Sequence, residues 1–165
     1  MAIEVYDENK LRELPEEERF AVCEHILKTD SDESKRWDAV WLLGELVEKR
    51  TSDDPLFGKV ADVMEWTLKN DTNGVVKHEV CYQIAGRNMR EKIPALVDAA
   101  LNDPSVLTKH EALESLGLMR AFDVVDLIRA AEKDPSIDVR ETASFVIKRF
   151  ERLKDHGEYK PSEIL

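Results

Sequence analysis

Two histidine-glutamate pairs are the residues of this sequence best suited to chemistry. The tripeptide Lys-His-Glu occurs at 77–79 and again at 109–111, which places His78 and His110 110 − 78 = 32 residues apart. The chain has only four histidines, so half of them stand in matched tripeptides. Adjacent His and Glu side chains on the first turn of a helix project about 100° apart. If neighbouring helices stack side by side, two imidazoles and at least one carboxylate converge on one point.

Two histidines and one carboxylate on one side of a metal ion leave coordination positions open. This arrangement is typical of non-haem Fe(II) sites that activate oxygen, and the same ligands suit zinc. A second interpretation is structural, because repeat proteins reuse residues where equivalent positions solve the same packing problem. The helix dipole also favours a carboxylate in the first turn whether or not a metal binds. The residues by themselves leave metal binding and a packing signature both open.

The segments that carry these pairs are parts of a longer repeat. One pattern of a basic residue, two variable positions and a later small residue is shared by 36–46, 77–88 and 109–119. A fourth segment, 134–150, aligns with 103–119 and has Glu141 at the histidine position. In the first three segments the small residues are Gly44, Ala85 and Gly117.

Amphipathic stretches separate these segments, at 55–70, 90–103 and 121–134. Asp-Pro pairs stand where helices should begin or end, and no strand-like alternation occurs. The sequence therefore predicts an all-α fold, an α-solenoid of HEAT-like helix pairs repeating every 31 to 41 residues, with an opening helix near 15–28. We expect one domain over 1–153, with about four repeats plus the N-terminal helix, and a loose polar tail over 154–165.

Other chemically interesting residues are ambiguous or unremarkable. Tyr82 and Glu114 each follow a motif histidine by four residues, on the same helix face. They could line a site, but core packing for Tyr82 and a surface salt bridge for Glu114 explain them equally well. Cys81 has no paired cysteine nearby and is expected to be a buried thiol. The three tryptophans are expected in the core: Trp37, Trp41 and Trp66.

Composition restricts the partners and the location. The net charge of −11 argues against binding to nucleic acid, and no apolar run approaches the roughly 18 residues of a membrane span. The acidic N-terminus lacks the apolar core of a signal peptide, and two cysteines form no disulfide framework. We therefore expect a cytoplasmic protein that acts neither on nucleic acid nor at a membrane.

The order of the motifs resembles one half of deoxyhypusine hydroxylase, a HEAT-repeat di-iron monooxygenase. The resemblance covers about 36–153 and includes both Lys-His-Glu tripeptides, "IPALVD", "HEALESLG", "IDVRET" and the closing "RFERL". Generic HEAT repeats match one or two of these features and lack the whole series.

The resemblance implies a specific ligand set and a reaction. His78, His110 and Glu111 correspond to iron ligands, and Glu79 to a catalytic pocket residue that faces the metal or an amine substrate. The family activates O2 between two ferrous ions and hydroxylates a modified lysine on a hypusine-type translation factor.

This chain departs from the family in one large respect, because it has two His-Glu pairs and the family has four. One copy therefore supplies one three-residue iron site. The simplest completion is a homodimer with a two-fold axis, in which each subunit binds one iron of a di-iron centre. A scaffold that docks a basic protein without chemistry, and an iron-binding relative with another substrate, are the alternatives.

Overall fold

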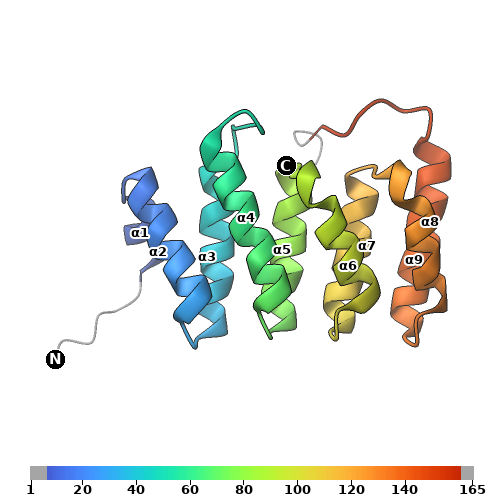
Figure 1. The fold of residues 1–165 in the computed structure, drawn as a ribbon, viewed down its shortest axis with the longest axis horizontal. Coiled ribbons are helices and arrows are strands. Elements are labelled where there is room, and N and C mark those ends of the chain that lie inside the picture. The colour runs from blue at the N-terminus through green and yellow to red at the C-terminus, as the bar shows by residue number, and fades with distance from the viewer. Residues whose placement is uncertain (1–6, 161–165) are drawn as a thin grey trace.

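The computed structural model describes residues 7–160, which form a row of helical hairpins (Figure 1). A short helix, α1 (Glu8–Arg12), precedes four hairpins: α2 (Glu16–Thr29) with α3 (Glu33–Leu46), α4 (Pro55–Asn70) with α5 (Gly74–Gly86), α6 (Ile93–Asn102) with α7 (Val106–Leu118), and α8 (Val125–Ile128) with α9 (Ile137–Leu153). These residues contain no strand. The all-α solenoid predicted from the sequence is confirmed.

The hairpins stack so that their first helices lie side by side in one layer and their second helices in another. In Figure 1, α2, α4, α6 and α8 form one layer, and α3, α5, α7 and α9 form the other. We call the second layer the second-helix row. Both Lys-His-Glu tripeptides lie in it, on the adjacent helices α5 and α7. No helix among the described residues is long and apolar enough to span a bilayer.

The predicted helices form, with two differences. His78 and His110 are each the fifth residue of their helix, so the His-Glu pairs lie in the second turn and not in the first turn as expected. The other difference is in the last hairpin. The opening helix and the 55–70 helix form as expected, and the 90–103 stretch becomes a 3₁₀ turn, Arg90–Lys92, followed by α6. The 121–134 stretch is not one α-helix, because α8 is flanked by 3₁₀ turns at Phe122–Val124 and Arg129–Lys133. Tight 3₁₀ turns are common at helix ends, and Pro135 keeps the residue before it out of the helical region.

Three of the four second helices start with a side-chain N-cap. The side chains of Asp32, Asn73 and Ser105 accept hydrogen bonds from backbone N–H groups in the first turns of α3, α5 and α7. These bonds satisfy donors that have no partner inside the helix, so the sequence sets where these three helices begin. The fourth, α9, begins after Ser136 without such a bond.

The lysine of each tripeptide joins its repeat to the next one. Lys77 Nζ lies 2.8 Å from an Asp103 carboxylate oxygen, and Lys109 Nζ lies 2.6 Å from Asp134. These aspartates also accept backbone N–H bonds in the turns that precede α7 and α9. The lysine therefore has a packing role, so the structural interpretation holds for this member of the tripeptide.

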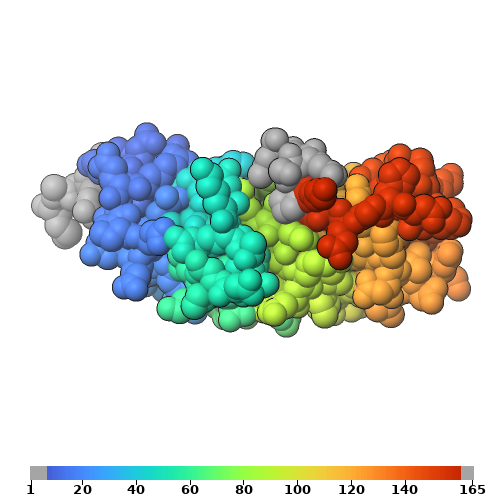
Figure 2. Space-filling model, turned by 90° about the horizontal axis from the view of Figure 1, so that it is seen from above, coloured from blue at the N-terminus to red at the C-terminus, as the bar shows by residue number. Residues whose placement is uncertain are grey.

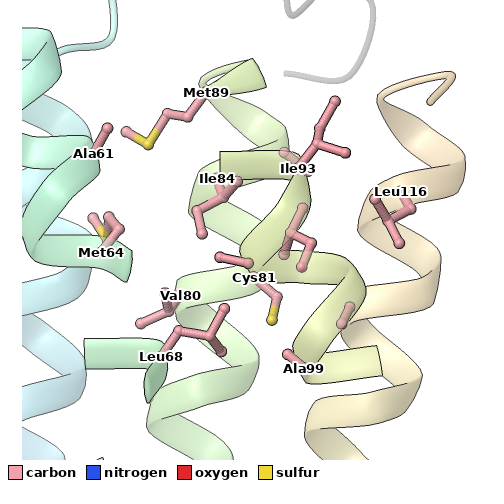
Figure 3. Packing of buried hydrophobic residues seen from close by; sticks show 14 of the residues in the cluster. Ala61, Met64, Leu68, Val80, Cys81, Ile84, Met89, Ile93, Ala99 and Leu116 are labelled. Carbon is pink, nitrogen blue, oxygen red and sulfur yellow. The ribbon is translucent and has the colours of Figure 1, made fainter. Parts of the chain in front are cut away.

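The core runs continuously between the two layers (Figure 3). Met64 and Leu68 of α4 pack near Val80 and Ile84 of α5. Cys81 is fully buried and free, as the sequence predicts. Burial raises the pKa of its thiol well above the usual value.

The prediction that all three tryptophans lie in the core is wrong. Trp66 is 36% exposed on α4, where the ammonium of Lys28 lies 5.3 Å from its ring centroid. Trp37 and Trp41 are half-buried and stack on each other, with ring centroids 6.3 Å apart. Indole rings on a repeat surface need only one covered face, and a cation or another ring supplies it.

The segment after α9 is not loose over its described part. It runs back from the last hairpin toward the middle of the molecule (Figure 2). Tyr159 is buried, and its hydroxyl donates a 2.9 Å hydrogen bond to the Ala85 carbonyl. Arg120 donates to the Gly157 carbonyl. The 154–160 segment is polar in composition, but its single tyrosine anchors it to α5. Residues 161–165 lie outside the described residues.

Candidate metal centre

Stacking brings equivalent positions of the second-helix row side by side. The first of these positions, the histidine position, holds Trp37, His78, His110 and Glu141 in the four hairpins. The next residue along each helix, the glutamate position, is Asp38, Glu79, Glu111 and Thr142.

The shortest contact between the two tripeptides joins His78 to Glu111. The Nε2 atom of His78 lies 3.0 Å from a Glu111 carboxylate oxygen. Two ligand atoms each about 2.1 Å from an ion and about 90° apart lie about 3.0 Å from each other. The separation is that of an ordinary hydrogen bond or ion pair, and it also allows the two atoms to bind one metal ion.

A second group of potential ligands lies on α7 itself. His110, Glu111 and Glu114 each present a ligand atom, and these atoms all lie within 4.8 Å of one another. The Nε2 atom of His110 is 3.5 Å from a Glu114 carboxylate oxygen. Glu114, which the sequence left undecided, thus belongs to the cluster, and Glu111 connects it to His78.

Glu111 occupies an environment that disfavours its negative charge. Its side chain is buried, and burial, then Glu114, then Glu79 raise its pKa to about 7. A carboxylate held among other carboxylates is stabilised by any cation that binds there.

Glu79 is buried but does not touch the histidines through any hydrogen bond. Its carboxylate accepts a 3.0 Å bond from the side-chain amide of Gln83, one turn later on α5. Gln83 in turn accepts a 3.2 Å bond from Arg87. This buried chain fixes the orientation of Glu79, and Gln83 is a residue that the sequence did not single out.

Tyr82 lies on the flank of the cluster. Its ring is nearly parallel to that of Trp41, with centroids 6.5 Å apart. Since Trp41 also stacks on Trp37, the N-terminal side of the cluster is a row of aromatic rings. Tyr82 packs against these rings, which is the packing role that the sequence left open for it.

On the other flank, Thr142 of α9 contacts His110. Its Oγ1 atom lies 2.7 Å from His110 Nδ1. Sequence reasoning missed Thr142, although the repeat alignment places it at the glutamate position and could have found it. His110 and Thr142 also line an open groove of about 580 Å³, whose remaining lining residues are Val106, Leu107, Glu114, Asp138, Glu141 and Phe145.

The donor set fits a divalent metal ion. Imidazole nitrogen and carboxylate oxygen are ligands that iron and zinc accept in proteins. The structure joins His78 to Glu111 across two repeats and groups His110 with Glu111 and Glu114 on α7, so Glu111 is the residue common to both contacts. His78 is not in the α7 group, but His78, His110 and Glu111, with Glu114 beside them, are the residues that could hold an ion.

Comparison with known proteins agrees with the repeat architecture. The family model for HEAT repeats matches residues 60–148, more than half of the chain. The chain belongs to the HEAT-repeat family. Within the matched region lie both Lys-His-Glu tripeptides and most of α9.

Similar HEAT-repeat proteins include deoxyhypusine hydroxylases. The Gallus gallus enzyme is 33% identical over 89 residues, covering 53% of this chain and 30% of the relative. The Saccharomyces cerevisiae enzyme is 29% identical over 134 residues, covering 80% of this chain and 41% of the relative. The resemblance predicted from the sequence is confirmed, and the chain spans less than half the length of these relatives.

A solved structure of human deoxyhypusine hydroxylase in complex with glycerol has the same fold. It superposes with a TM-score of 0.71 at 24% identity, covering 88% of this chain and 48% of that chain. This likeness is one of fold, and it concerns about half of the larger HEAT-repeat structure.

Proposed function

We propose that this HEAT-repeat chain is a non-haem di-iron oxygenase resembling deoxyhypusine hydroxylase, which hydroxylates a modified lysine side chain on a protein. The observation that carries the proposal is the 3.0 Å contact between His78 Nε2 and Glu111 across two repeats. It brings together two of the three residues that the family resemblance assigns as ligands. The curated relatives that share this region are hydroxylating enzymes by name.

In this proposal His78, His110 and Glu111 are the iron ligands of one subunit. Bound ferrous iron supplies the ability to activate O2. The chain keeps the ligands in place through the packing of α5 on α7 and through the lysine-aspartate pairs that link the repeats. Hydroxylation of an aliphatic carbon needs such a fixed site, because the oxidant must meet one C–H bond and no other.

Glu79 is proposed to orient the substrate. Its buried carboxylate is held from one side by Gln83 and is a suitable acceptor for an ammonium group. The groove beside His110 combines the carboxylates of Glu114 and Asp138 with the exposed apolar side chains of Leu107 and Phe145. An alkylamine, such as an extended lysine side chain, matches this combination of charge and apolar surface.

A homodimer is proposed to complete the centre. The described residues offer one set of two histidines with a carboxylate, where the family resemblance implies two such sets. Two copies about a two-fold axis would present two such sets to each other, with one iron per subunit. Both cysteines are buried and free, which suits the cytoplasmic location that we propose.

Native mass spectrometry after anaerobic Fe(II) loading tests this function. A dimer with two irons, and a His78→Ala variant without iron, are the expected results. Hydroxylation of a deoxyhypusine-bearing translation factor, assayed by mass change of the protein substrate, tests the reaction itself.

Other results identify the alternatives. A metal-free monomer whose partner affinity is unchanged by His78→Ala would leave a protein-binding scaffold as the better description. Iron binding without turnover of that substrate would point to a relative with a different substrate.

A further inference from the structure

Thr142 of α9 occupies the position that holds a glutamate in α5 and α7. It is 7% exposed and lies on α9, the last long helix of the stack. Its Oγ1 atom has two partners at 2.7 Å, namely Nδ1 of His110 and the backbone carbonyl of Asp138. A threonine hydroxyl has one hydrogen to donate, so only one of these contacts uses it.

The carbonyl of Asp138 decides which contact uses the hydrogen. A carbonyl oxygen cannot donate, so the 2.7 Å separation between it and Oγ1 requires the hydroxyl hydrogen to lie between them. If that hydrogen pointed at His110 instead, two oxygen atoms would face each other without a proton. The Oγ1 lone pair therefore accepts from His110, and the proton of the neutral imidazole sits on Nδ1.

The other ring nitrogen of His110 then carries a free lone pair. Nε2 faces the carboxylates, 3.5 Å from Glu114, in the group of ligand atoms that includes Glu111. Only the unprotonated nitrogen of an imidazole binds a metal ion. A residue that fixes the proton on the far nitrogen prepares the near one, and such partners orient the ring as well.

We infer that Thr142 is a positioning residue for the metal centre, which holds His110 in the Nδ1–H tautomer and aims Nε2 at the ion. The inference rests on the proposed function, and it adds α9 to the two helices that supply the ligands. In this role the fourth hairpin supports the site without contributing a ligand, and the threonine does for His110 what a carboxylate or carbonyl does in other histidine sites.

The tautomer is measured directly in the metal-free protein. Long-range ¹H–¹⁵N correlation spectra at pH 8, assigned with a His110→Gln variant, distinguish the two neutral forms of the ring. The expected native form is Nδ1–H, and Thr142→Val is expected to shift His110 toward the Nε2–H form. A native His110 in the Nε2–H form would overturn the inference whether or not the protein binds iron, so its failure is distinct from failure of the proposed function.

Fe(II) affinity, measured anaerobically by chelator competition, gives the second readout. Thr142→Val is expected to weaken binding by about 10- to 100-fold, whereas Thr142→Ser keeps the hydroxyl and stays within about threefold of the native value. Thr67→Val is the matched control, because Thr67 is buried in α4 and bonds the carbonyl four residues before it in the same way. Native affinity in a folded Thr142→Val protein, or an equal loss in Thr67→Val, would overturn the inference.

Discussion

The second-helix row has two kinds of repeat, although all four share a frame. In α5 and α7 the histidine position holds an imidazole and the glutamate position a buried carboxylate. In α3 the same histidine position holds Trp37, stacked on another indole, and in α9 it holds the exposed Glu141. The backbone frame is therefore common to all repeats, and the chemistry belongs to the middle pair.

The lysine of the tripeptide and its His-Glu pair have different roles. Its lysine belongs to a series that includes Arg36, which pairs with Asp71 at 2.8 Å just as Lys77 pairs with Asp103. Arg36 is followed by Trp37 and Asp38 and not by a His-Glu pair, so the basic residue serves stacking where that pair is missing. The histidine and the glutamate occur together only where α5 and α7 meet, so stacking does not account for them.

The largest expected effect is on Fe(II) affinity, when the histidine that distinguishes α7 from α9 is removed at His110. Replacing His110 by Ala takes away a ligand, so Fe(II) affinity should fall by on the order of 1,000-fold, more than the loss of a supporting residue causes. Glu141→Ala changes the equivalent position of α9 and should leave affinity within about twofold. Chelator competition under anaerobic conditions measures both. Equal effects of the two substitutions would show that the repeats do not differ in metal binding.

The ion pair that joins neighbouring repeats can be removed at Lys77. Both members of its pair with Asp103 are nearly buried, with 4% and 8% of their side chains exposed. Lys77→Met leaves the carboxylate without its cation, and we expect a loss of about 3 kcal/mol in the free energy of unfolding. The exposed pair of Lys69 with Glu65 supplies the control, where Lys69→Met should cost about 0.5 kcal/mol or less. Urea titration of both variants decides whether the lysine is needed for stacking.

A pH series sharpens the contrast between buried Glu111 and exposed Glu141. Folding raises the pKa of Glu111 from 4.5 to about 7, chiefly through burial, so the fold prefers the protonated acid. The metal-free protein therefore loses stability as pH rises from about 4.5 to 7, and the full penalty is present above 7. Glu111→Gln should raise the free energy of unfolding by on the order of 2 to 3 kcal/mol at pH 8 and by almost nothing at pH 4.

The same urea titrations on Glu141→Gln provide the reference for that series. If Glu111→Gln and Glu141→Gln give the same result at both pH values, Glu111 does not carry a burial penalty. The comparison is made on metal-free protein, because a bound cation would stabilise the carboxylate and reverse the sign at high pH.

The smallest expected effect concerns the small residue of the repeat. A Cβ atom on Gly44 would lie 1.9 Å from the Gln83 side-chain oxygen. Gly44→Ala must displace Gln83 from its bonds to Glu79 and Arg87, and we expect a net loss of about 1 to 2 kcal/mol after the gain in helix propensity. Gly58→Ala, where nothing lies within 4 Å, should stabilise by up to about 1 kcal/mol. A stabilised Gly44→Ala protein would contradict this account.

Sequence periodicity was sufficient for the repeat architecture, because the long helices have apolar faces, and Asp-Pro pairs or capping side chains mark several of their ends. It also predicted that His78 and His110 lie on adjacent helices, which follows from stacking equal units. It gave no signal for Gln83, whose bonds to Glu79 and Arg87 depend on side-chain rotamers. The repeat alignment did mark the position of Thr142, but not its contact with His110 on the neighbouring helix. The exposure of Trp66 was missed for a related reason, since Lys28 of another helix covers its ring.

The tail beyond α9 has a consequence for how this stack comes apart. In a simple array each repeat touches only its neighbours, so the last one can unravel alone. Here Tyr159 reaches Ala85 across 74 residues of sequence, passing over the third hairpin to the end of α5. The chain end is thereby tied to one of the two helices that carry the His-Glu pairs. Unfolding of the last hairpin alone must therefore break the Tyr159 contact as well, which couples its stability to that of α5.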